Sequence, residues 1–507
     1  MSSRRSTLIL ALVVFFAGLG LFSRNNTFPF YYHPDEPGKV AQLINRKRNF
    51  HHPMLMLTTC DLVRRVVLHG DAAKDPQAVV ELGRWVTAAF AAATAALLAL
   101  LAMHAHGLWV GAGVGALCVL NPLLFELAHY FKEDPFFGAG VAATALAVHF
   151  YSREQSRRTM ACMGAAAGLA AAGKYVGAAF VPAVMVVAAC IGGPGRWKRA
   201  GWVFGSALLA WLVVDWWVFK SPELMTQSLD EEMAKAYEGE QGIMRQVPHN
   251  YYLVVQNRWG GPWVPALAVL WVAFAVWRPR RIPAAEWLLA GAALVLYAVL
   301  SFTPKTSPRY FLPIATTLCY LAPAGLAHWL SLAGKQRSFA FVAILLVATA
   351  GALQSRILWQ TYAAFRDDDR LELIAAVKAL PPSAKLAQDD ATNLPEPDRR
   401  WEHKGREPLP QFILGAKRAC DLGSIAKLRA NGFTHVALCN RTFERFLGGG
   451  RVVTDPTGAG ARRDFYETAL KEGLILQTWK QGLVTYMQPG LVLIDITKIE
   501  TPAEGGK

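Results

Sequence analysis

Apolar segments of nearly membrane-spanning length recur along the first 355 residues of the chain. A helix that crosses a bilayer needs about 20 consecutive, mostly apolar residues. We count eleven candidates, at 6–23, 84–103, 108–127, 136–151, 159–173, 175–191, 201–218, 263–277, 285–302, 310–331 and 338–355. The whole chain is 53% hydrophobic over 507 residues, and a soluble protein of this length rarely carries so many apolar runs. The pattern therefore predicts an all-α polytopic membrane protein.

The basic residues lie on one side of this expected arrangement. The net charge is +15, and alternate short loops hold Arg4, Arg5, Arg153, Arg157, Arg158, Arg196, Lys198, Arg199, Arg278, Arg280, Arg281, Lys335 and Arg337. Cytoplasmic loops of membrane proteins carry such an excess of Lys and Arg. This predicts a multi-pass protein of the inner (plasma) membrane with a cytoplasmic N-terminus. The same distribution argues against nucleic acid as a partner and leaves membrane lipid as the partner of these residues.

With eleven spans, the C-terminus falls outside the cell membrane. The expected outer segments are 24–81, 219–262 and 356–507. The last is polar enough to fold by itself, so we predict a transmembrane domain at 1–355 and a small extracytoplasmic α/β domain at 356–507. In the second domain, helix-like stretches alternate with strand-like runs at 434–438, 474–478, 484–487 and 491–496. Asp367 is expected to cap the first helix, and Cys420 and Cys439 either pair there or remain buried thiols.

Ionisable residues gather at the outer ends of the expected spans. The pair Asp35-Glu36 follows the first span, and the others are Arg84, Glu126, Lys132, Glu133, Asp134, Lys174, Asp215, Lys305 and Arg309. A secondary transporter is expected to place polar groups near the middle of the bilayer, at broken helices. The middle of each span here is nearly free of charge. The arrangement favours an enzyme at the outer membrane surface, with one lipid-borne reactant.

The residue types indicate which reaction such an enzyme would perform. A carboxylate can serve as a general base for an incoming hydroxyl group. The cations Lys132, Lys174, Lys305 and Arg309 can neutralise the negative charge that builds on a departing phosphate. Together these groups match the transfer of a group from a lipid phosphate to a nucleophile.

Several short motifs, taken in order, resemble the GT-C membrane glycosyltransferases. They are HPDEPGK, FHHPML, LHG, GRWVTAAFAAATAALL, NPLLFELAHYFKEDPFFG, GLAAAGKYVGAAFVPA and KTSPRYFLPI, and they span roughly residues 6–330. The closest branch is the bacterial protein-mannosyltransferase-like and aminoarabinose-transferase-like enzymes. The stretch GFTHVALCNRTFERFL also resembles the soluble domain that ends many such chains.

This resemblance implies a donor sugar linked to a polyprenyl phosphate and assigns roles by position. Asp35 matches the first-loop acid that is the usual catalytic base, with Glu36 beside it. Glu133-Asp134 matches the second-loop acidic motif, with Asp134 as a further catalytic candidate. Lys174 and Arg309 match basic positions that face the donor phosphate, beside Tyr175 and Tyr310. The sequence departs from the family at His52-Pro53-Met54 and at Lys132, where an arginine is frequent.

Other interpretations of these residues remain. Arg84 could anchor a first-loop acid rather than act in the site, and Glu36 could orient Asp35. His52, with the adjacent His51, could bind a divalent metal, although a histidine pair without spaced carboxylates is a poor metal signature. No nucleotide cofactor is implied, because the sequence lacks a phosphate-cradling glycine loop.

We expect an inverting glycosyltransferase whose acceptor is lipid A, a surface polysaccharide or a protein. The alternatives are a flippase or transporter of a lipid-linked sugar precursor, and a non-catalytic subunit of a polysaccharide assembly machine.

Overall fold

The chain folds into two compact units. The computed structural model describes residues 2–191, 195–238, 243–245, 260–302, 307–332, 337–396, 408–447, 451–453, 456–484 and 486–499. The first unit comprises Met1–Phe30, Asp35–Ala234 and Val247–Thr361. The second comprises Tyr31–Pro34, Lys235–Gln246 and Tyr362–Lys507.

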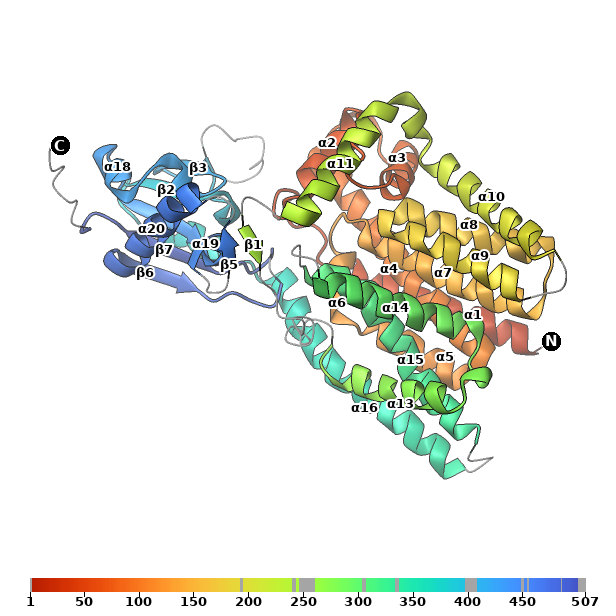
Figure 1. The fold of residues 1–507 in the computed structure, drawn as a ribbon. Helices are drawn as coiled ribbons and strands as arrows, with labels where there is room; N and C mark the ends of the chain where they lie inside the picture. The colour runs from red at the N-terminus through yellow and green to blue at the C-terminus, as the bar shows by residue number, and fades with distance from the viewer. Residues whose placement is uncertain are drawn as a thin grey trace. The chain divides into compact units, whose positions relative to one another are not determined.

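All the long elements of the first unit are helices (Figure 1). The helices are α1 (Ser2–Phe22), α2 (Glu36–Ile44), α3 (Leu55–Val67), α4 (Pro76–His106), α5 (Leu108–Val119), α6 (Pro122–Ala128), α7 (Asp134–Arg153), α8 (Arg157–Gly173), α9 (Phe180–Cys190), α10 (Arg196–Val214), α11 (Pro222–Glu238), α13 (Trp263–Trp277), α14 (Ala284–Phe302), α15 (Leu312–Leu330) and α16 (Arg337–Arg366). Every apolar segment identified in the sequence falls on these helices or their 3-10 extensions.

The predicted fold class is confirmed. By length and composition, 5 helices in the described part of the chain can cross a membrane, and a bent pair would raise this number to 6. They are Arg5–Phe22, Pro76–His106, Ala284–Ser301, Pro308–Leu332 and Ser338–Lys378, with α5 and α6 as the bent pair. Tyr175–Cys190 and Trp263–Trp277 are shorter apolar helices. The eleven segments are thus helical, although only some have full spanning length and apolarity.

A capped bend between α5 and α6 positions the loop that follows. The two helices differ in direction by 57°. Asn121 begins α6, since its side chain accepts hydrogen bonds from the backbone N–H groups of Leu123 and Leu124. Pro122 lacks an N–H group and suits the first position of a helix. Helix α6 then ends at Ala128, and the short loop 129–133 leads into α7.

Two glycines allow α8 and α10 to approach closely. Gly164 and Gly168 lie four residues apart on one face of α8, and α10 packs against that face at Val203 and Ala207. A Cβ atom on Gly168 would collide with the backbone carbonyl of Ala207. Small residues at this spacing let membrane helices bring their backbones together. The sequence GAAAG therefore fixes this helix pair.

The second unit contains a mixed sheet of five strands in the order β3-β2-β4-β7-β6. The strands are β2 (Lys385–Asp389), β3 (Phe412–Ala416), β4 (His435–Cys439), β6 (Leu474–Trp479) and β7 (Leu491–Asp495). Strand β2 is parallel to β3 and β4, whereas β7 is antiparallel to β4 and β6. All residues of β4 are buried, as expected for an apolar central strand.

Helices and a small strand pair complete this unit. The helices are α17 (Asp369–Lys378), α18 (Ile425–Ala430), α19 (Asn440–Leu447) and α20 (Pro456–Glu472), and β1 (Ile243–Arg245) pairs antiparallel with β5 (Arg451–Val453). Buried Asp389 accepts hydrogen bonds from the backbone of Ala419 and Cys439 and from the Tyr466 hydroxyl group. This carboxylate therefore ties the end of β2 to the neighbouring segments.

Two local predictions for the second unit were wrong. Segment 484–487 is no strand where it is described, because the N–H groups of Met487 and Gln488 bond back to the Val484 carbonyl in a turn. The cap of α17 is Asp368 rather than Asp367, since the Asp368 side chain accepts from the Arg370 N–H group. Cys420 and Cys439 are both free thiols.

We predict that Gly168→Ala destabilises the first unit, because the added methyl group pushes α8 away from α10. The melting temperature of the purified protein in detergent should fall by several degrees. Gly205→Ala is the matched control, since Gly205 lies on exposed α10 surface with nothing within 4 Å of an added Cβ. Equal melting temperatures for the two variants would refute the close α8–α10 contact.

Candidate active site

A buried ion pair joins the start of α2 to α4. Glu36 begins α2, and its carboxylate accepts from Arg84 through Nε at 2.9 Å and Nη2 at 2.5 Å. Both side chains are fully buried. The backbone N–H group of Phe131 donates to the same carboxylate at 2.8 Å. Arg84 also donates to the backbone carbonyls of Asn26 and Phe28, so the pair fastens two loops to one helix.

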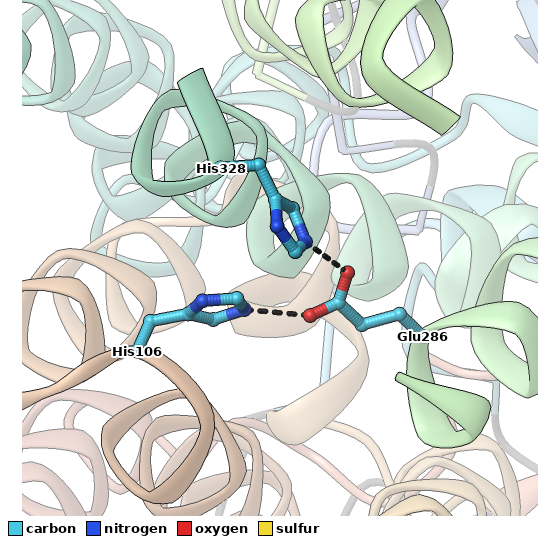
Figure 2. Close-up of side chains that lie close together, drawn as sticks. All are labelled: His106, Glu286 and His328. Atoms are coloured by element: carbon cyan, nitrogen blue, oxygen red, sulfur yellow. Dashed lines mark hydrogen bonds and ion pairs between the residues drawn. The ribbon is translucent and has the colours of Figure 1, made fainter. Parts of the chain in front are cut away.

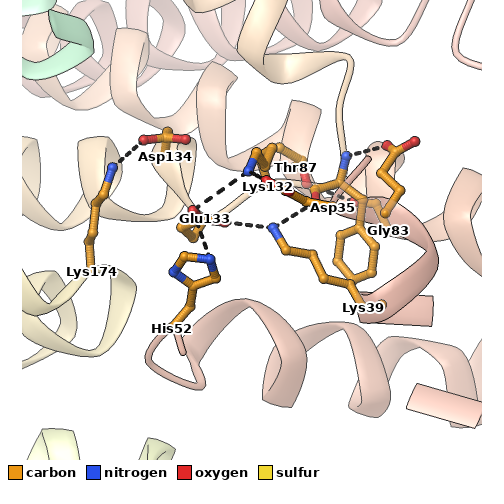
Figure 3. Close-up of polar contacts among 12 residues, drawn as sticks. Asp35, Lys39, His52, Gly83, Thr87, Lys132, Glu133, Asp134 and Lys174 are labelled. Atoms are coloured by element: carbon orange, nitrogen blue, oxygen red, sulfur yellow. Dashed lines mark hydrogen bonds and ion pairs between the residues drawn. The ribbon is translucent and has the colours of Figure 1, made fainter. Parts of the chain in front are cut away.

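A second acid, Glu133, lies buried at the end of loop 129–133 among cations (Figure 3). Its Oε2 atom is 2.6 Å from Lys39 Nζ, and its Oε1 atom is 3.6 Å from His52 Nε2. Burial alone would raise the pKa of Glu133, but His52, Lys132, Lys39 and Lys174 lower it well below the ordinary value. Glu133 therefore stays ionised near pH 7, and its charge attracts the lysines around it.

Asp35 is the most exposed acid of the group. Its Oδ2 atom contacts Lys132 Nζ and lies 3.3 Å from Arg309 Nη1. The Asp35 side chain is 37% exposed, whereas Lys132 is fully buried. Burial and Arg309 would each lower the pKa of Lys132, but Glu133, Asp35 and Asp134 outweigh them and raise it. Lys132 is thus held as a cation beside a carboxylate that solvent can reach.

The ring of Tyr310 lies beside both basic candidates, Lys174 and Arg309. Lys174 Nζ lies 2.6 Å from Asp134 Oδ1 and 4.7 Å from the centre of the Tyr310 ring. The Arg309 guanidinium lies 5.3 Å from the centre of the same ring. Residues 174 and 309 come from different helix breaks, before the 3-10 turn Tyr175–Ala179 and within the turn Pro308–Phe311. Both remain partly exposed, so an incoming anion can reach them.

Three sequence candidates remain, namely Tyr175, His52, which borders this group at Glu133, and Lys305. The Tyr175 hydroxyl group donates to the Phe50 carbonyl at 2.7 Å, so it braces the segment between α2 and α3. Burial lowers the pKa of His52 to about 4, which keeps its ring neutral near pH 7. Lys305 lies outside the described residues. No group of three metal-ligating side chains occurs among the residues described at this site.

Two residues of this region were not identified as site residues from the sequence. Lys39 was overlooked, although its place three residues after Glu36 puts both on the buried face of the amphipathic helix α2. Asp215 was noted only as an ionisable residue near a span end. Its Oδ1 atom accepts from the Met54 N–H group at 2.8 Å and fixes the start of α3.

The chain has the fold of known membrane glycosyltransferases. No protein-family model and no curated protein matches it. The crystal structure of ArnT from Cupriavidus metallidurans bound to undecaprenyl phosphate matches with a TM-score of 0.50 and 14% identity, over 98% of each chain. The Archaeoglobus fulgidus oligosaccharyltransferase in its apo form matches with a TM-score of 0.51 and 12% identity, over 88% of this chain and 71% of that one. The resemblance predicted from the sequence is thus confirmed at the level of the fold.

We predict that Glu36→Gln destabilises the first unit, because it leaves the Arg84 charge buried without a counter-charge. Removing one partner of a buried ion pair typically costs about 3–5 kcal/mol. The melting temperature in detergent should fall sharply, with loss of folded protein on size-exclusion chromatography. Glu81→Gln, one turn before Arg84 and partly exposed, makes the same charge change and should have little effect. A Glu36→Gln protein as stable as this control would contradict a structural role for the pair.

Proposed function

We propose that this protein is an inverting glycosyltransferase that uses a polyprenyl-phosphate-linked sugar and acts on an acceptor hydroxyl group at the outer face of the inner membrane. The observation that carries the proposal is the group formed by Asp35, Lys174 and Arg309. The partly exposed Asp35 carboxylate lies 3.3 Å from the Arg309 guanidinium. The Tyr310 ring contacts both Arg309 and Lys174. A base and fixed positive charge thus lie close together.

In the proposed reaction, Asp35 accepts the proton of the acceptor hydroxyl group. The acceptor oxygen forms a bond to the anomeric carbon as the bond between that carbon and the phosphate oxygen breaks. The departing polyprenyl phosphate takes the electron pair, and Lys174 and Arg309 stabilise its negative charge. A single displacement inverts the anomeric configuration.

The neighbouring residues would position these three. Lys132 contacts the Asp35 carboxylate and would orient it towards the acceptor. Asp134 pairs with Lys174 at 2.6 Å, which supports a role in aiming the lysine rather than in proton transfer. Both oxygens of Glu36 accept hydrogen bonds from buried groups, so we assign this residue a positioning role. Arg309 would exchange part of its contact with Asp35 for the donor phosphate.

The donor class is supported by the fold and by charge. The similar ArnT structure contains undecaprenyl phosphate. The cationic side chains of Lys174 and Arg309 suit a phosphate in this chain. We keep lipid A, a surface polysaccharide and a protein as acceptors. The proposed orientation, with loop 153–158 cytoplasmic, can be tested by the side from which cysteines introduced there react with a membrane-impermeant reagent.

A flippase or transporter of a lipid-linked sugar precursor is the alternative function. Purified protein in liposomes that contain labelled polyprenyl-phosphate sugars distinguishes the two. Release of polyprenyl phosphate, with the sugar transferred to acceptor or water, supports the enzyme. Movement of intact donor across the bilayer without cleavage supports the transporter.

We predict that Asp35→Asn lowers turnover by about two orders of magnitude or more, as expected for the loss of a general base. Donor binding should persist, because the amide keeps the shape of the side chain. Asp71→Asn, at an exposed position of the same outer loop, is the control and should retain full activity. Near-normal turnover in Asp35→Asn would remove this residue from the catalytic role.

We predict that Lys174→Ala and Arg309→Ala each lower turnover by roughly 10²-fold, by analogy with the loss of one fixed donor. Each should also weaken donor binding. Because both cations act on one phosphate, the double variant should lose less than the product of the single losses. The exposed Lys74→Ala variant controls for net charge. Fully multiplicative losses would show that the two residues do not share a ligand.

A further inference from the structure

Two histidines and a glutamate from three different helices meet in a second buried cluster (Figure 2). His106 is the last residue of α4, Glu286 lies in the first turn of α14, and His328 lies in the last turn of α15. His106 Nε2 is 2.6 Å from Glu286 Oε1, and His328 Nε2 is 2.9 Å from Glu286 Oε2. All the potential ligand atoms lie within 4.8 Å of one another.

This cluster lies far from the candidate active site. Arg84 and His106 lie near opposite ends of α4, and 22 residues of helix rise by about 33 Å, close to the thickness of a bilayer core. Basic residues mark the end that holds His106. Arg153 there donates a hydrogen bond to the His104 carbonyl at 3.3 Å, and the turn Pro279–Arg281 precedes Glu286. The cluster is therefore a separate feature of the first unit.

We propose that His106, Glu286 and His328 bind one divalent transition-metal ion, with Zn²⁺ as the representative cation. Imidazole nitrogens and a carboxylate oxygen are common zinc ligands, and three protein ligands leave a fourth position for water. A tetrahedral site separates its ligand atoms by about 3.4 Å, given metal–ligand bonds of about 2.1 Å. The histidine–carboxylate spacings of 2.6 Å and 2.9 Å are shorter than that value, and the ligand atoms lie no more than 4.8 Å apart, so side-chain rotations would bring them to tetrahedral separations.

The surroundings of Glu286 support a metal site. Trp271 Nε1 donates to Glu286 Oε2 at 2.6 Å, and the Tyr320 hydroxyl group lies 3.4 Å from Oε1. Such outer contacts orient the ligands of metal sites. Glu286 is fully buried. The rings of His106 and His328 lie edge to face, with their centres 4.8 Å apart. The ligands are thus oriented before any ion binds.

A metal ion at this position would cross-link three helices. Only 17% of the residues in segment Ala284–Ser301 of α14 are buried, so few packing contacts hold this helix in the unit. An ion shared by α4, α14 and α15 would fix its first turn. The competing interpretation is a metal-free triad in which both histidines donate hydrogen bonds to the carboxylate.

The decisive measurement is metal binding to the full-length protein in detergent, purified through a tag without histidine and treated with a chelator. After Zn²⁺ is added back and excess ion is removed by gel filtration, elemental mass spectrometry should find one tightly bound Zn²⁺ per chain. Co²⁺ substitution should give the intense visible absorption of a four- or five-coordinate site. Zn²⁺ should also raise the melting temperature of the protein.

Variants identify the ligands. His106→Gln and His328→Gln should each lower Zn²⁺ affinity at least tenfold and abolish the Co²⁺ absorption. His104→Gln, two residues earlier on α4 and outside the cluster, should behave like the unmodified protein. The proposal is overturned if the unmodified protein retains no stoichiometric Zn²⁺ and gives only the spectrum of aqueous Co²⁺, a result that requires no variant to fold. Retention that survives both glutamine substitutions would also overturn it.

Discussion

The buried pair between Glu36 and Arg84 is the interaction on which the rest of the candidate site depends. Two charges removed from water are stable only when each neutralises the other and their remaining hydrogen-bonding capacity is met. Here the carboxylate accepts from the guanidinium and from the Phe131 backbone, while the guanidinium also reaches the carbonyls of the first loop. Asp35 directly precedes Glu36, so the position of the proposed base follows from this pair.

Around that pair, the site balances charge and leaves a small excess of positive charge. Four carboxylates face five cations: Asp35, Glu36, Glu133 and Asp134, with Lys39, Arg84, Lys132, Lys174 and Arg309. Glu36 with Arg84 and Glu133 with Lys39 are buried pairs, whereas Asp35 and Lys174 are partly exposed and pair with buried partners. The partly exposed cations, Lys174 and Arg309, contact one tyrosine ring. This gradient from buried pairs to accessible cations suits a site that receives an anionic lipid headgroup from one side, because a phosphate can compete only for charges that it can reach.

Helix α4 connects two chemically different clusters. One end carries Arg84 and the acid–base group, and the other ends at His106 in a histidine–carboxylate cluster. The first cluster leaves Lys174 and Arg309 partly exposed, whereas Glu286 in the second is enclosed by Trp271 and Tyr320. In our proposals, a helix of this length separates a reactive surface from a metal site that holds helices together.

The sequence by itself determined the helical membrane class. It also predicted the side on which basic loops gather, and it singled out Asp35, Lys132, Lys174 and Arg309, which the structure places in contact with one another or with shared neighbours. These follow from local properties, namely apolar segment length and charge beside helix ends. Tertiary structure alone decided that Lys39 pairs with Glu133 and that Glu36, rather than Asp35, is the acid that Arg84 holds. It also brought together His106, Glu286 and His328. The spacing of these residues along the chain carries no signal, because their contacts arise only when separate helices pack side by side.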